Sequence, residues 1–123
     1  MQLIGAEGRL AQLSENDKPV LVYSTYPSPG EAERIGGVLV DRGLAACVNI
    51  IPAMTAIYVW QGKRQTDTEA VMIIKTRAEI ADAVVAEVCK LHPYDNPAVV
   101  VLPVSGGSAD FLRWITEQTA RPG

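Results

Sequence analysis

A single histidine limits where this 123-residue chain could use imidazole chemistry. His92 lies directly before Pro93, which cannot continue a helix. Cys89 lies three residues earlier, so a helix that ends here would place the thiol and the imidazole at neighbouring positions of its surface. Cys89 and His92, with Asp95 close behind, are therefore a candidate metal site. The structural alternative is that Cys89 packs as a small apolar residue and His92 donates a hydrogen bond to a backbone carbonyl.

A second group of residues is more typical of a small-molecule site than of a metal site. Glu69 and Lys75 are an even number of residues apart in a predicted strand, so both belong to one face of its sheet. Trp60 and Tyr94 could complete a polar and aromatic pocket if subunits bring them together. The alternative is that Trp60 anchors an interface, Tyr94 ends the corner, and the two charged residues form an exposed pair of little energy.

Enzymatic chemistry finds little support in the sequence. The loop at residues 105–108 has no lysine after its glycines, unlike a P-loop, and no Gly-x-Ser-x-Gly motif occurs. Any catalytic triad would need His92 as its base. Cys47 lies among small apolar residues with no nearby cation to lower its pKa, so we expect an inert, buried thiol. We expect that the protein is not an enzyme.

Composition and charge exclude several classes of partner. Eleven Lys and Arg against 14 Asp and Glu give a net charge of −3 without a basic run, which argues against nucleic acid. No apolar run is long enough to cross a membrane. The two cysteines have no recognised metal or redox spacing, which favours reduced thiols and a cytoplasmic location.

The apolar spacing predicts alternating strands and helices that would position these side chains. Residues 20–26 form the first predicted strand, and a helix follows. Residues 44–60 form a long strand with a bend or bulge at Pro52. A turn at residues 61–64 leads into a third strand over residues 68–76, so these two strands should form a long hairpin.

The remaining elements are a helix, a strand and a last helix. Apolar residues at helical spacing predict the second helix over residues 80–91. The very apolar run at residues 98–102 predicts a central strand that is buried on both faces. In the last helix, the spacing of Phe111, Trp114 and Ile115 places them on the buried face.

This order of elements predicts an α+β protein, a ferredoxin-like βαββαβ sandwich with an extra C-terminal helix and a long hairpin between its second and third strands. We expect residues 19–123 to form this single domain and residues 1–18 to be a flexible N-terminal extension. The hairpin has more apolar surface than a small monomer usually exposes, so we expect the chain to form oligomers.

These elements contain segments that resemble the CutA family of divalent-cation tolerance proteins. The similarity runs from about Val20 to Thr119 and is carried, in the family's order, by Leu44–Pro52, Tyr58–Lys63, Met72–Thr76, Leu91–Tyr94 and Leu102–Ile115. The resemblance implies a tight homotrimer with the same ferredoxin-like fold, in which long hairpins pair between subunits. It also implies a role in the tolerance of or response to copper or another divalent cation, with no established enzymatic reaction.

The resemblance also indicates a change at the metal site. Family members with a proposed copper site have a cysteine late in the first strand and two adjacent histidines before a Pro-Tyr pair. The matching positions here are Ser24, Leu91 and His92. A hydroxyl is a poor substitute for a thiolate on copper, so we expect weakened metal binding in this chain.

The same resemblance places Trp60, Glu69, Lys75 and Tyr94 around an intersubunit cleft. Two other functions therefore stay open beside metal tolerance. One is a PII-like regulatory trimer that senses a small molecule in this cleft, an analogy at the level of the fold. The other is a structural trimer without a ligand.

Overall fold

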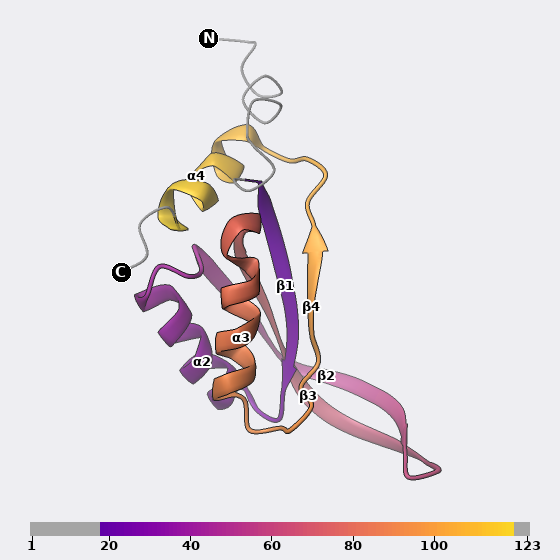
Figure 1. The fold of residues 1–123 in the computed structure, drawn as a ribbon. Helices are drawn as coiled ribbons and strands as arrows, with labels where there is room; N and C mark the ends of the chain where they lie inside the picture. The colour runs from indigo at the N-terminus through magenta and orange to yellow at the C-terminus, as the bar shows by residue number, and fades with distance from the viewer. Residues whose placement is uncertain (1–17, 120–123) are drawn as a thin grey trace.

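The computed structural model describes residues 18–119 (Figure 1). Apart from Lys18, the predicted N-terminal extension lies outside these residues. The elements, in chain order, are β1 (Pro19–Tyr26), α2 (Pro29–Asp41), β2 (Cys47–Trp60), β3 (Lys63–Arg77), the short 3₁₀ helix η2 (Ala78–Ile80), α3 (Ala81–Leu91), β4 (Val99–Pro103) and α4 (Ala109–Thr119). This is the predicted βαββαβ order followed by one helix.

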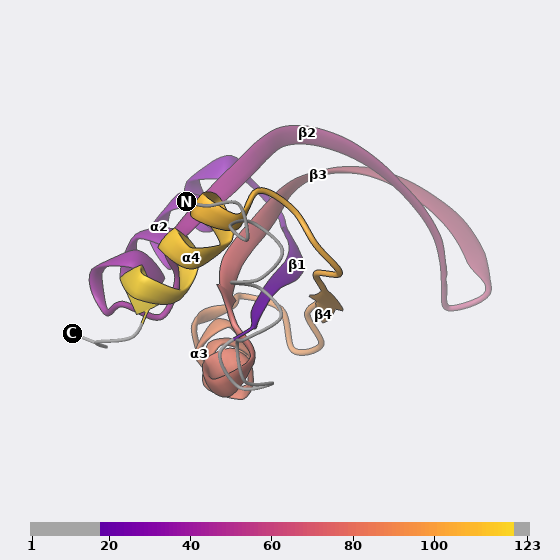
Figure 2. The same ribbon diagram turned by 90° about the horizontal axis from the view of Figure 1, so that it is seen from above.

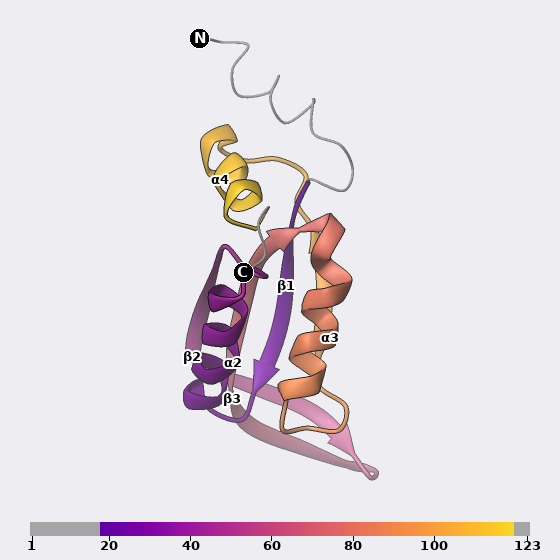
Figure 3. The ribbon, with the colours of Figure 1, turned by 60° about the vertical axis from the view of Figure 1, so that its left-hand side comes forward.

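The four strands form one antiparallel sheet in the order β2-β3-β1-β4. Helices α2 and α3 lie beside each other over one face of this sheet (Figure 3). Helix α4 lies at the end of the sheet where β1 begins (Figures 1 and 3). Its C-terminal turn is held by the buried Arg77, whose Nε and Nη2 donate to the Thr119 carbonyl oxygen at 3.3 and 3.0 Å.

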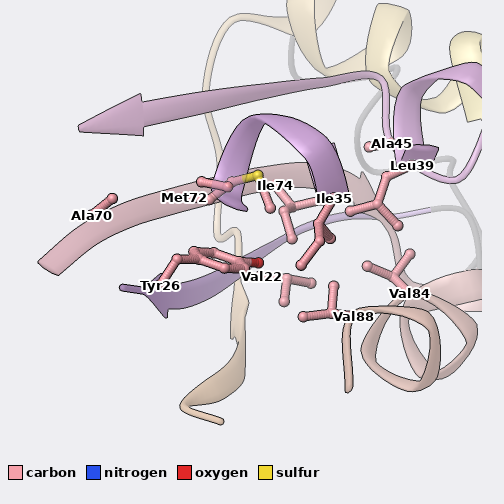
Figure 4. Packing of buried hydrophobic residues seen from close by; sticks show 11 residues of the cluster. Val22, Tyr26, Ile35, Leu39, Ala45, Ala70, Met72, Ile74, Val84 and Val88 are labelled. Carbon is pink, nitrogen blue, oxygen red and sulfur yellow. The ribbon is translucent and has the colours of Figure 1, made fainter. Parts of the chain in front are cut away.

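The core lies between the sheet and the two covering helices (Figure 4). Its fully buried residues alternate along β1 and β3 and recur at helical spacing in α2 and α3, as the two periods require; among them are Val22, Met72, Ile74, Ile35, Leu39, Val84 and Val88. Gly36 lets α2 approach the sheet closely: a Cβ here would lie 2.9 Å from both Met72 Sδ and Val48 Cγ2. The α2 start is capped by Ser28, whose Oγ accepts from the Glu31 backbone N–H at 3.2 Å.

The hairpin of β2 and β3 projects beyond the rest of the sheet and curves away from it (Figure 2). Strand β1 pairs with β3 only over Ala70–Arg77, so residues 54–60 and 63–69 pair with each other outside the four-stranded part. The register shifts between Ile51 and Met54, which confirms the bulge predicted at Pro52. The turn is tighter than predicted: Gln61 and Gly62 both have positive φ, and β3 begins directly after them.

The prediction that residues 98–102 form a central strand buried on both faces is wrong. Strand β4 pairs with β1 alone among the described residues and forms an edge of the sheet. Val100 and Leu102 are 51% and 43% exposed. They lie opposite Tyr23 and Leu21, on the face of the sheet that α2 and α3 do not cover.

The predicted buried face of the last helix is also partly wrong. Ile115 is buried, but its buried companions are Ala109, Leu112 and Thr119. Phe111 and Trp114 are exposed, and their rings stack on each other with centroids 5.7 Å apart.

Candidate functional site

A cleft of about 690 Å³ lies between the projecting hairpin and the corner that joins α3 to β4. The hairpin contributes Tyr58, Trp60 and Glu69 to its lining. The corner contributes Tyr94 together with residues 95 and 96. Three of the four predicted ligand-binding residues therefore line one cleft within a single chain.

A hydrogen bond crosses this cleft from the corner to the hairpin. Tyr94 Oη donates to Glu69 Oε2 at 3.2 Å. On the hairpin itself, Tyr58 Oη donates to Asp67 Oδ2. The hairpin register places Tyr58 opposite Gln65, so Asp67 is its diagonal neighbour on the same face.

Sequence analysis missed Tyr58 and Asp67 as site residues. The two-residue turn was the available signal, because it fixes the pairing of Trp60 with Lys63 and so brings Tyr58, Trp60, Asp67 and Glu69 onto one face. A turn over residues 61–64 would shift the pairing by two positions, which keeps these residues on one face but changes which of them lie opposite each other.

Lys75, the fourth predicted ligand-binding residue, is outside the cleft lining of this chain. It is six residues from Glu69, which corresponds to roughly 20 Å along a strand. Its Nζ lies 5.3 Å from the centroid of the Phe111 ring instead. That a second subunit brings Lys75 to the cleft stays a prediction.

The cleft has an acidic and aromatic lining. Glu69 and Asp95 belong to it, three aromatic side chains contribute to its walls, and no basic residue among residues 18–119 lines it. Burial and then the negative charge of Glu69 raise the pKa of Tyr94. The hydrogen bond to Asp67 is the main cause that raises the pKa of Tyr58. Carboxylates contribute to the raised pKa of both tyrosines, and burial is the larger cause for Tyr94.

The single histidine is buried next to Pro93 and Tyr94 of the cleft lining and makes two hydrogen bonds. His92 Nε2 lies 2.7 Å from the Thr25 carbonyl oxygen, and Nδ1 lies 3.1 Å from the backbone nitrogen of Tyr94. A carbonyl oxygen only accepts and a backbone N–H only donates, so the imidazole is neutral with its proton on Nε2. The predicted structural alternative for His92, a bond to a backbone carbonyl, is confirmed.

Aromatic stacking and a buried hydroxyl pair complete this corner. The His92 ring stacks on Tyr26 with centroids 4.7 Å apart. Tyr26 Oη lies 2.7 Å from Ser24 Oγ, which also donates to the Met72 carbonyl oxygen at 3.3 Å. Burial raises the pKa of Tyr26 to about 12.

The residues of this corner do not fit a tight copper site within one chain. Both His92 nitrogens are used in hydrogen bonds, Ser24 Oγ is bonded within the core, and Leu91 has no donor atom. Cys89 is exposed, so the alternative that it packs as an apolar residue is wrong. Cys47, predicted to be buried, is half-buried. Among residues 18–119, no group of three or more His, Cys, Asp or Glu side chains could hold a metal ion.

The fold is that of an α+β protein with a four-stranded antiparallel sheet, a projecting hairpin and a cleft between that hairpin and the α3–β4 corner. The family model described as CutA1 divalent ion tolerance protein matches residues 20–118. The chain therefore belongs to the CutA family. No helix in the part of the chain that the structure describes is long and apolar enough to cross a membrane.

Relatives with this fold occur in plants and bacteria. Protein CutA 1, chloroplastic, of Oryza sativa subsp. japonica is 40% identical over 114 residues, which are 93% of this chain and 64% of that protein. The divalent-cation tolerance protein CutA of Pectobacterium atrosepticum is 36% identical over 104 residues, 81% of this chain and 94% of that protein. The chain thus spans less than two thirds of the rice protein and nearly all of the bacterial one.

A solved structure agrees closely with the fold described above. The crystal structure of CutA1 from Oryza sativa superposes with a TM-score of 0.81 at 40% sequence identity. The superposition covers 86% of this chain and 97% of the rice chain.

Proposed function

We propose that this chain forms a non-enzymatic, cytoplasmic homotrimer that acts in the tolerance of divalent cations such as copper. Family membership supports the role, because relatives of similar length are named divalent-cation tolerance proteins. The observation that carries the proposal is the match of residues 20–118 to the family model described as CutA1 divalent ion tolerance protein.

Exposed apolar side chains support the proposed trimer. Ile57 and Val59 on the hairpin are 65% and 69% exposed in the single chain, and soluble monomers rarely expose large groups of apolar side chains. Val100 and Leu102 on the edge strand β4 form a second group of exposed apolar side chains. An edge strand with apolar side chains is a pairing site for another strand, so a hairpin from a second subunit is a suitable cover.

The geometry of the His92 corner supports the proposal that direct metal binding is weakened here. A metal ion at His92 would replace its hydrogen bond to Thr25 or its hydrogen bond to Tyr94, and that backbone group would then lose its partner. Cys89 alone adds only one further donor, whereas transition-metal sites usually have three or four protein ligands.

Ligand sensing is the second function that we propose for the chain, and the size of the cleft favours it. A volume of about 690 Å³ lies within the range of small-molecule sites and far exceeds the space of a single ion. A PII-like regulatory trimer would use this cleft to bind a small molecule and pass its occupancy to a partner.

Complementation of a copper-sensitive bacterium that lacks its own relative tests the role in tolerance. We expect the wild-type chain to restore growth in added copper, and Glu69→Gln to lose most of that rescue. Glu33→Gln is the matched control, because Glu33 is an exposed carboxylate on α2, outside the cleft. Cys89→Ser tests the alternative that tolerance depends on the Cys89 and His92 corner and not on the cleft.

Sedimentation equilibrium of the same purified proteins tests the trimer. A wild-type protein that is expressed as a trimer and restores no growth would contradict the proposed role. A loss of rescue in Cys89→Ser but not in Glu69→Gln would assign tolerance to the corner. A sedimentation mass of one chain would contradict the proposed assembly.

A further inference from the structure

We propose that the cleft selects small organic cations of the alkylammonium class, held by Glu69 and by the faces of Tyr58, Trp60 and Tyr94. The inference rests on the proposed ligand-sensing function and names the chemical class of its ligand. Three independent features of the cleft lead to it: the sign of its charge, the kind of its walls and its size.

The charge of the cleft favours a cation over an anion. Within residues 18–119, its lining contains Glu69 and Asp95 and no Lys, Arg or His side chain. Asp67 adds a third carboxylate, which accepts the hydrogen bond of Tyr58. The basic side chain that follows on the same face, Lys63, pairs with Trp60 at the hairpin turn, outside the lining. Among the described residues of one chain, a nucleotide or a carboxylic acid would meet only negative charge here.

The aromatic walls favour an organic cation. Trp60 is 63% exposed and Tyr94 39% exposed, so large parts of their rings are open to a ligand. Ammonium groups are attracted to the faces of Trp and Tyr rings, and such rings around a carboxylate form the usual receptor for alkylated ammonium ions. The Tyr58 hydroxyl is bonded to Asp67 and the Tyr94 hydroxyl to Glu69, which fixes both rings beside carboxylates.

The size of the cleft and the number of its donors argue against a metal ion as the occupant. The cleft is about 690 Å³, enough for several carbon atoms beside the charge. Hard divalent cations need six or more oxygen ligands, and no suitable group of three acidic, His or Cys side chains occurs among residues 18–119. The pKa of Tyr58 is raised mainly by its hydrogen bond to Asp67, and that of Tyr94 by burial and then by the charge of Glu69. The carboxylates that contribute to both shifts would also attract an ammonium group.

Three probes of equal length isolate the effect of charge: butylammonium, butanol and butyrate. Binding to the assembled protein is followed by the NMR signal of the Trp60 indole N–H, with Trp114→Phe used to assign it. We expect saturable shifts with butylammonium, at an affinity at least about tenfold above that of butanol, and no binding of butyrate. Glu69→Gln should reduce the affinity for butylammonium about tenfold, because the charge that pairs with the ammonium group is lost. Glu33→Gln should leave it unchanged.

Butyrate that binds as well as butylammonium would overturn the inference, as would equal binding of butanol or an absence of binding by all three probes. The same spectra with Mg²⁺ and Zn²⁺ complete the test: a shift of the Trp60 signal by these ions alone would assign the cleft to metal cations. Such a result would leave the proposed role in tolerance intact, because that role is tested separately by growth in copper. If the wild-type chain restores no growth in copper but binds butylammonium specifically, the role in tolerance is contradicted and the inference about the cleft stands.

Discussion

Alanine substitutions at two adjacent glycines of α2 can show how closely this helix packs on the sheet, through their effects on the free energy of unfolding. Gly36 faces the sheet, and a Cβ there would lie 2.9 Å from Met72 Sδ and 2.9 Å from Val48 Cγ2. Gly37 faces away, and a Cβ there would meet nothing within 4 Å. Methionine adjusts easily, but valine is stiff about χ1, so the contact with Val48 can be relieved only by movement of the helix or of β2.

The two glycine variants should change stability in opposite directions. Alanine in place of glycine inside a helix stabilises it by about 0.5–1 kcal/mol, so Gly37→Ala should raise the free energy of unfolding by that amount. Gly36→Ala has the same helical gain but adds an overpacked methyl group, which costs about 1–3 kcal/mol. The difference between the variants cancels helix propensity and should be about 1–3 kcal/mol in favour of Gly37→Ala.

Urea unfolding followed by circular dichroism gives this difference. Both variants must be compared at the same protomer concentration, because assembly would make the midpoint depend on concentration. Equal stabilisation by the two substitutions would refute the close approach of α2 to the sheet at Gly36. A similar loss in both would show that the difference in surroundings between the two glycines has no energetic consequence.

Two further predictions concern the buried corner. The pKa of Tyr26 rises from 10.0 to about 12 on folding, so its contribution to stability is complete below pH 10 and is lost as the pH rises through 12. We expect the free energy of unfolding to drop by roughly 2–3 kcal/mol across this window. Urea unfolding curves recorded between these pH values should show the drop in the wild-type protein and not in Tyr26→Phe. His92→Ala should lower the free energy of unfolding by about 2–4 kcal/mol, because Thr25 and Tyr94 each lose a buried hydrogen-bond partner and a ring-sized space remains. His92→Gln, which can still donate to one of these groups, should cost less; equal losses in the two variants would contradict the role of the hydrogen bonds.

The sequence predicted the order of the elements because the two periodicities are strong. Alternation of apolar residues along β1 and β3 and helical spacing in α2 and α3 left few alternatives. The bulge near Pro52 was predictable for a local reason, since proline cannot donate to the strand pairing. These features depend on interactions within one or two neighbouring elements.

Predictions failed where an apolar side chain could be covered in more than one way. The apolar run that contains Val100 and Leu102 is typical of a central strand. Within the described residues, however, β4 pairs only with β1, and both side chains are exposed. In α4, apolar residues occupy more than one face, and the face with Leu112 and Ile115 is the one that packs, while Phe111 is left outside. Hydrophobicity indicates that a residue prefers to be covered, but it does not identify the surface that covers it.

The candidate site shows the same limit in a different form. Glu69 and Lys75 share a face of β3, as predicted, but a shared face extends along the whole strand and does not imply contact. Glu69 meets Tyr94 because the corner after α3 returns to the base of the hairpin, and the backbone N–H of Tyr94 donates to His92. The only histidine of the chain thus fixes one wall of the cleft through hydrogen bonds that leave neither ring nitrogen for a metal. This arrangement gives His92 a positioning role, which the residue type alone could not distinguish from the role of a ligand.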